Sequence, residues 1–212
     1  MDKTNYGWKS IMKKVTIGSV ALMLMGAVAL VAFYSYFEYQ SYHIAKQHHL
    51  APQDVNSIKH AYTAALVYRA LRGAGLSSHR ATQTTLSFGM VNEYFERVVK
   101  YHQPDSMKEI MKDMYNNHAG VVAMRWHEQH HIPTHPYYAS VEAIIGRMVK
   151  HHVVLATESD VHERHHEASS IPAAHRWAQQ QQLPIMKHVH RALMIPKRSL
   201  AHEEKIVSKP AS

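Results

Sequence analysis

Residues 106–122, SMKEIMKDMYNNHAGVV, are the stretch that decides the predicted fold class. Their apolar side chains recur at steps of three and four residues, which is the period of one face of an α-helix. Ser106 and Glu109 fit the capping box that begins a helix, directly after a break at Gln103-Pro104. Because polar residues from Asp113 to Asn117 interrupt the apolar ones, we expect one helix that carries both core residues and a polar centre.

The same helical period extends to both sides of this stretch. Helices are predicted over about 54–73, 78–98, 137–156 and 173–182, and the last of these is bounded by Pro172 and Pro184. Methionines at helical spacing are expected in the core. No strand pattern and no internal repeat is present. The sequence therefore predicts an all-α protein, with one N-terminal transmembrane helix, a compact bundle of about four main helices and a disordered C-terminal tail.

A long uncharged segment precedes the bundle. Residues 15–37 read VTIGSVALMLMGAVALVAFYSYF and contain neither a charge nor a proline. As a helix this segment would be roughly 35 Å long, slightly more than the ~30 Å hydrocarbon core of a bilayer. Four lysines and one aspartate precede it, which favours a cytoplasmic N-terminus. We expect a bacterial inner-membrane protein with residues 1–14 in the cytoplasm and its C-terminal domain in the periplasm.

A cleaved signal peptide is the alternative interpretation of this segment. Ala27-Val28-Ala29 resembles a cleavage site. The apolar run nevertheless continues into Tyr34, Tyr36 and Phe37, and aromatic residues are favoured where a span meets the membrane surface. The length and the aromatic end favour a retained signal anchor.

Composition limits the remainder of the chain to one domain. After the anchor, roughly 170 residues remain, enough for one compact core. We expect a helical neck over 38–52, the helical domain over 53–156, a histidine-rich helical extension over 157–196 and the disordered tail over 197–212. The chain has no cysteine, which excludes disulfides and thiolate metal sites.

The charge distribution indicates which partners to expect. Residues from 38 onward contain 20 Lys and Arg against 15 Asp and Glu, without a dense basic stripe that has interleaved aromatic residues. Nucleic-acid binding is therefore not expected. The lipid bilayer and other envelope proteins are the candidate partners.

Histidine is the unusual component, since all 20 histidines follow the anchor. Two segments, 127–131 and 162–166, match H-E-x-x-H, in which two histidines one turn apart hold zinc and the glutamate acts as a base. The candidate ligands are His127, His131, His162 and His166, with zinc or another divalent cation as the candidate cofactor. Polar residues at the middle positions, and Pro133 just after the first motif, oppose a protease site. Two other interpretations of these segments remain: a surface that binds metal ions, or a polar helix face that is simply exposed to solvent. Because histidine titrates near pH 6.5, a pH-responsive module is a further alternative.

A second set of polar residues lies in helices that have strong apolar faces. His60, Glu93 and Asp113 are its titratable members, and Asp113 lies one turn from Asn117. Adjacent asparagines in mid-helix have poor helix propensity, so a polar network between helices is expected to compensate. The additional candidate binding residues are Tyr62, Asn92, Tyr115, Asn116 and Asn117.

These residues allow two interpretations. His60, Glu93 and Asp113 could serve as a base, an acid and an orienting or cation-holding carboxylate, with the asparagines positioning a substrate. The alternative is a purely structural role, in which these buried groups hydrogen-bond to one another and fix the register of the helices. The sequence favours a binding or accessory role at the envelope, with an envelope hydrolase as the first alternative.

Three short motifs carry a resemblance to a known family. They are Lys59-His60-Ala61-Tyr62 with Ala65-Leu66, then Asn92-Glu93, then Asp113-Met114-Tyr115-Asn116-Asn117 with Gly120. Over about residues 57–125 the chain resembles an uncharacterised bacterial all-helical exported domain family, also seen at the ends of polymorphic toxin-like proteins. Family members commonly have Asn where this chain has Thr63, and Ala-His where it has Val91-Asn92. The resemblance implies an exported helical domain and does not supply an activity.

Overall fold

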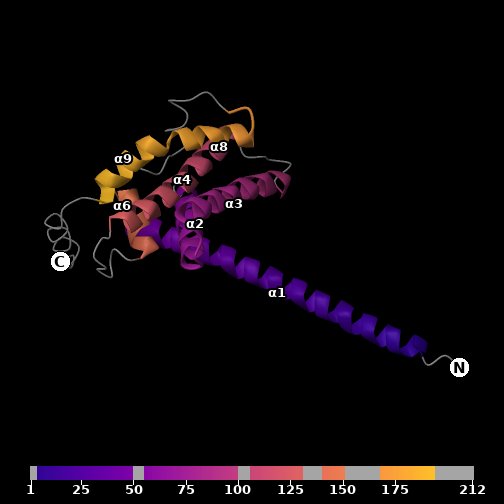
Figure 1. Cartoon of the computed structure of the whole chain (residues 1–212). Coiled ribbons are helices and arrows are strands. Elements are labelled where there is room, and N and C mark those ends of the chain that lie inside the picture. Colours follow the sequence, from indigo (N-terminus) through magenta and orange to yellow (C-terminus); the bar gives the residue numbers. More distant parts are fainter. Residues whose placement is uncertain (1–3, 50–54, 100–105, 131–139, 151–167, 194–212) are drawn as a thin grey trace. The chain divides into compact units, whose positions relative to one another are not determined.

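The structure is a computed structural model that describes residues 4–49, 55–99, 106–130, 140–150 and 168–193. Within the first helix, side chains are described at 16, 19, 23–26, 28 and from 31 onward. The described residues form helices and short turns without any strand, so the all-α prediction is confirmed (Figure 1). The helices are α1 (Thr4–Gln47), α2 (Val55–Gly73), α3 (Ser78–Val99), α4 (Met107–Gln129), α6 (Val141–Lys150), α8 (Ile171–Gln180) and α9 (Gln182–Leu193).

The chain divides into two compact units, residues 1–39 and residues 40–212. The first unit consists of most of α1, a helix of 44 residues. Among the residues that the structure describes, no helix combines the length and the apolar composition needed to cross a membrane. The second unit holds α2 to α9 and contains the candidate site.

Helix α4 is the central element of the second unit. It packs against α2, α3, α6, α8 and α9, and 15 of its 23 residues are buried. Its predicted cap is present, since the Ser106 side chain accepts a hydrogen bond from the Glu109 backbone N–H at 3.1 Å. A helix that is buried on nearly every side must satisfy any polar side chain that it carries through its neighbours.

Two glycines allow helices to approach α4 very closely. A Cβ atom added at Gly120 would lie 2.0 Å from the backbone carbonyl oxygen of Ala61 in α2. A Cβ atom added at Gly89 of α3 would lie 2.6 Å from Nδ2 of Asn117. At Gly120 the near atom is backbone, so a larger residue does not fit and this glycine sets the spacing of α2 and α4. At Gly89 the near atom is the end of the Asn117 side chain, so a larger residue would displace that amide.

The C-terminal helices correct part of the sequence prediction. Pro172 and Pro184 were expected to bound a single short helix, but each lies in the first turn of a helix, α8 and α9 respectively. Proline fits there because the first backbone N–H groups of a helix have no intrahelical acceptor. Helix α8 packs its buried residues against Ile110, Met111 and Met114 of α4, which confirms Met111 and Met114 as core residues, while Met107 is partly buried beside them.

Helix α3 buries part of its apolar surface and leaves the rest exposed. Its apolar stripe has the helical spacing of a core face, yet Phe88 is 58% exposed and Phe95 is 66% exposed. Glu93, on the other side of the helix, is only 2% exposed. The described part of α3 therefore buries a carboxylate together with Ala81 and Leu86 and leaves two phenylalanines exposed. The predicted disordered tail over 197–212 lies outside the described residues.

The contact between Gly120 and Ala61 gives a direct test of this packing. We expect Gly120→Ala to lower the free energy of unfolding by about 3 kcal/mol, because the added methyl group meets backbone rather than a side chain that can move. Chemical denaturation followed by circular dichroism measures the change. Gly73→Ala is the matched control, since a Cβ at Gly73 meets nothing within 4 Å. Equal stability of the two variants would contradict the close approach of α2 and α4.

Candidate functional site

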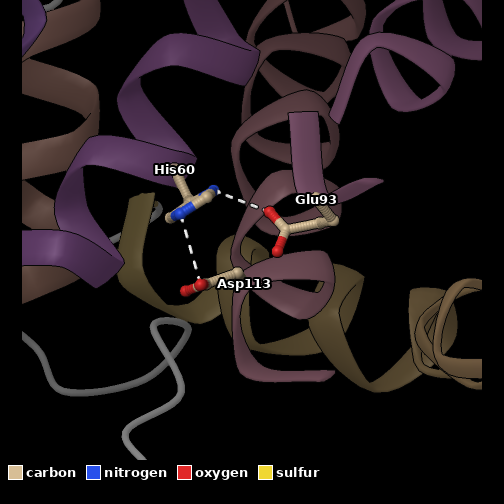
Figure 2. Close-up of side chains that lie close together, drawn as sticks. All are labelled: His60, Glu93 and Asp113. Atoms are coloured by element: carbon tan, nitrogen blue, oxygen red, sulfur yellow. Dashed lines mark ion pairs between the residues drawn. The ribbon is translucent and has the colours of Figure 1, made fainter. Parts of the chain in front are cut away.

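Three titratable side chains from three helices converge at one point, which we call the polar centre. His60 comes from α2, Glu93 from α3 and Asp113 from α4 (Figure 2). His60 Nε2 lies 3.3 Å from Asp113 Oδ2, and His60 Nδ1 lies 4.0 Å from Glu93 Oε1. One potential ligand atom from each residue lies within 4.8 Å of the other two. The sequence had grouped these three residues, and the structure brings them together.

The polar centre is almost fully enclosed by protein. The side chains of His60, Glu93 and Asp113 are 8%, 2% and 5% exposed, respectively. Interactions between charges are stronger in such an environment than in water, but removing each charge from water is costly. Burying two neighbouring carboxylates therefore destabilises the folded protein unless other groups compensate for their charges.

Asp113 receives two kinds of compensation. The Asn56 side chain of α2 donates Nδ2–H toward Oδ1 and Oδ2, each at 3.4 Å. The ammonium of Lys112 lies 3.8 Å from Asp113 Oδ1 and also 3.8 Å from Glu109 Oε1. The Lys112 side chain is itself only 5% exposed. Asp113 is thus held between one buried cation, one amide and the His60 ring.

His60 is a neutral ring in this setting. Burial lowers the pKa of His60 from 6.5 to about 4, and the positive charges of Lys59 and Lys112 act in the same direction. Glu96 and the side-chain amide of Asn117 act in the opposite direction, each with a smaller effect than burial. At neutral pH the imidazole therefore keeps one nitrogen lone pair, which can accept a proton or bind a cation.

The predicted binding residues divide into two groups. Asn116 and Asn117 of α4 are buried, and the side-chain hydrogen bond of Asn117 raises the pKa of His60. The other three have contacts of their own. Tyr62 donates its hydroxyl hydrogen to Glu142 of α6, Asn92 donates to Glu96 at 2.7 Å, and the Tyr115 ring lies 6.1 Å from the Trp177 ring of α8.

The first H-E-x-x-H segment is only partly described, and its glutamate has a different role from the one in zinc proteases. Glu128 accepts hydrogen bonds from the Tyr68 hydroxyl at 2.9 Å and from Arg72 Nε at 3.1 Å, which ties the end of α4 to α2. His127 lies in the last turn of α4. His131, His162 and His166 lie outside the described residues. The proposed zinc ligation by these histidines stays a prediction.

A pair of histidines between α4 and α8 had no signal in the sequence. The rings of His118 and His175 have centroids 5.5 Å apart, and His118 is 1% exposed. Burial lowers the pKa of His118 to about 3, with the nearby His175 adding to the effect, and burial also lowers the pKa of His175. Only the packing of α8 on α4 places the two rings together, so periodicity along the chain could not reveal them.

Comparison of the chain with protein-family models, curated proteins and solved structures found no match. The resemblance to an exported helical domain family therefore stays a prediction. The assignment of function depends on the geometry of the polar centre and on the residues themselves.

The burial of His118 predicts an acid-sensitive fold. Because its pKa is about 3 in the folded protein, against 6.5 for a histidine in water, the unfolded chain binds a proton over this pH range that the folded chain does not. Stability is therefore present above pH 6.5 and is lost as the pH falls toward 3, by up to about 1.4 kcal/mol per pH unit. Urea denaturation at pH 7 and pH 4.5 measures the loss.

His118→Gln isolates this contribution, since glutamine does not titrate. We expect the variant to lose less stability than the parent protein between the two pH values, whatever its stability at pH 7. Parallel losses in the two proteins would show that His118 takes up its proton equally well in the folded state.

Proposed function

We propose that this chain is a single-pass, membrane-anchored envelope protein whose helical domain binds a ligand through the polar centre. The observation that carries the proposal is the convergence of His60, Glu93 and Asp113 from three different helices in an enclosed position. Three helices contribute one titratable group each, which is the usual construction of a binding site in a helical bundle.

The orientation of α3 supports a binding role over a purely structural network. A helix that carries an apolar stripe would gain stability by burying it, at about 25 cal/mol per Å². Instead α3 buries Glu93 and leaves Phe88 and Phe95 more than half exposed. Costly buried charges of this kind are concentrated at functional sites. The arrangement supports the proposal that Glu93 serves the chemistry of the polar centre.

The membrane anchor rests on the sequence. The uncharged run from Val15 to Phe37, with lysines before it, supports an N-terminus in the cytoplasm and the domain in the periplasm of a bacterial inner membrane. An anchored binding domain in that position would work as an accessory factor, with the bilayer and other envelope proteins as its partners.

A hydrolase is the second candidate function. An imidazole 3.3 Å from one carboxylate and 4.0 Å from another has the arrangement of a general base with an orienting acid. A base must reach its substrate, however, and the His60 side chain is only 8% exposed. A ligand small enough to lie inside the polar centre fits this burial better than a substrate of ordinary size.

Glu93→Gln tests whether the polar centre is a binding site or a structural network. The change keeps the shape of the side chain and removes one of two neighbouring buried carboxylates. We expect the free energy of unfolding to rise by about 1 kcal/mol, because a desolvation cost and a like-charge repulsion are both removed. Denaturation with urea at pH 7.5 measures it.

Glu128→Gln is the matched control, because Glu128 forms an ordinary ion pair with Arg72 at 3.1 Å. Removing its charge should lower stability slightly, by less than about 1 kcal/mol. If Glu93→Gln destabilises the protein as well, the polar centre is a structural network and the proposed binding role is wrong.

The anchor predicts how the full chain behaves in cells. We expect the protein to stay in the membrane pellet after an alkaline carbonate wash, and the chain without residues 15–37 to be soluble. Because the chain has no cysteine, single cysteines report orientation cleanly. An impermeant maleimide should label Ser87→Cys, at an exposed position, but not Ser10→Cys in intact spheroplasts. Release by the wash, or the reverse labelling, would contradict the proposal.

A further inference from the structure

We propose that the ligand of the polar centre is a divalent metal ion, held by one ring nitrogen of His60 and one carboxylate oxygen each from Glu93 and Asp113. This inference rests on the proposed function, in which the polar centre is a binding site, and it names the chemical class of the ligand. The proposed ligand set is different from the H-E-x-x-H histidines.

The distances within the polar centre are close to those of a metal site. A metal ion about 2.0–2.2 Å from each of its ligand atoms holds those atoms roughly 3–4 Å apart. The three potential ligand atoms of His60, Glu93 and Asp113 already lie within 4.8 Å of one another. The three atoms would have to approach one another only slightly to ligate one ion.

The charges of the polar centre favour a cation with more than one positive charge. Glu93 and Asp113, which as whole residues are 2% and 3% exposed, supply two carboxylates. Lys112 is the buried cation beside Asp113, and it is shared with Glu109. A divalent ion held between the two buried carboxylates would reduce their mutual repulsion.

Neighbouring amides supply the outer layer that metal ligands usually have. The Asn56 amide orients both oxygens of Asp113, and the Asn117 amide acts on the His60 ring. A metal-bound histidine normally has its second ring nitrogen hydrogen-bonded, which fixes the tautomer and the ring orientation. This role would explain Asn117 in mid-helix, where asparagine is unfavourable for an isolated helix.

The ligand set also limits which metals fit. One imidazole and two carboxylates suit Zn²⁺ and Mn²⁺, whereas soft ions such as Cu⁺ prefer sulfur ligands. The chain contains no cysteine at all. We therefore expect Zn²⁺ and Mn²⁺ to bind at the polar centre, with water completing the coordination.

The experiment measures binding of Mn²⁺ and Zn²⁺ to the full-length protein in detergent, by calorimetry and by the shift in Tm. We expect one tight site for each metal and a rise in Tm on saturation. Glu93→Gln should weaken this site by about tenfold or more. Lys112→Gln should tighten it, because the ammonium and the metal compete for Asp113. Opposite effects of two buried substitutions cannot both arise from a general loss of stability.

His127→Gln is the matched control, because it removes a histidine from the H-E-x-x-H segment and leaves the polar centre intact. The affinity of the tight metal site should be the same in His127→Gln as in the parent protein. If no tight site exists, or if His127→Gln removes it and Glu93→Gln does not, the metal inference is overturned. Absence of binding together with a stabilised Glu93→Gln variant would overturn the metal alone, and leave the polar centre as a site for another ligand.

Discussion

The contact on which the second unit depends is the approach of the Gly120 backbone in α4 to the carbonyl oxygen of Ala61 in α2. A single added carbon at Gly120 would lie 2.0 Å from that oxygen. Ala61 follows His60 directly, and Asn117 lies one turn before Gly120 on α4. The close contact therefore sets the separation of α2 and α4, and with it the distance between the His60 ring and the polar side chains of α4. A wider spacing of the two helices would leave the 3.3 Å contact between His60 and Asp113 unformed.

The electrostatics of the polar centre follow from this close packing. Because the helices leave no room for bulk water around His60, burial dominates its pKa and keeps the ring neutral. The same enclosure makes Lys112 important, since its ammonium is the buried positive charge beside Asp113. Two carboxylates meet the imidazole at this centre, with the ammonium of Lys112 beside Asp113 and the charge of Lys59 acting on His60. The proposed metal ion would reduce the repulsion between the two carboxylates.

Sequence reasoning located the polar centre but not the packing around it. The helices, the Ser106 cap and the grouping of His60, Glu93 and Asp113 follow from local signals, namely periodicity, capping residues and asparagines in unfavourable positions. The histidine pair of His118 and His175 depends on which helices pack together, and no local pattern encodes that. The prediction that Pro172 and Pro184 lie outside a helix was wrong because proline is also accepted in the first turn of a helix.

The orientation of α3 shows why periodicity alone was insufficient. Glu93 and Phe95 are two residues apart, about 200° around a helix, so only one of them can face α4. Gly89 lies one turn before Glu93 and therefore on the same face. The Asn117 amide lies against the Gly89 backbone, where a Cβ would be 2.6 Å from Nδ2. With the Gly89 face of α3 against α4, Glu93 is directed inward and Phe95 outward, an orientation that depends on contacts between helices and not on the period of the apolar residues.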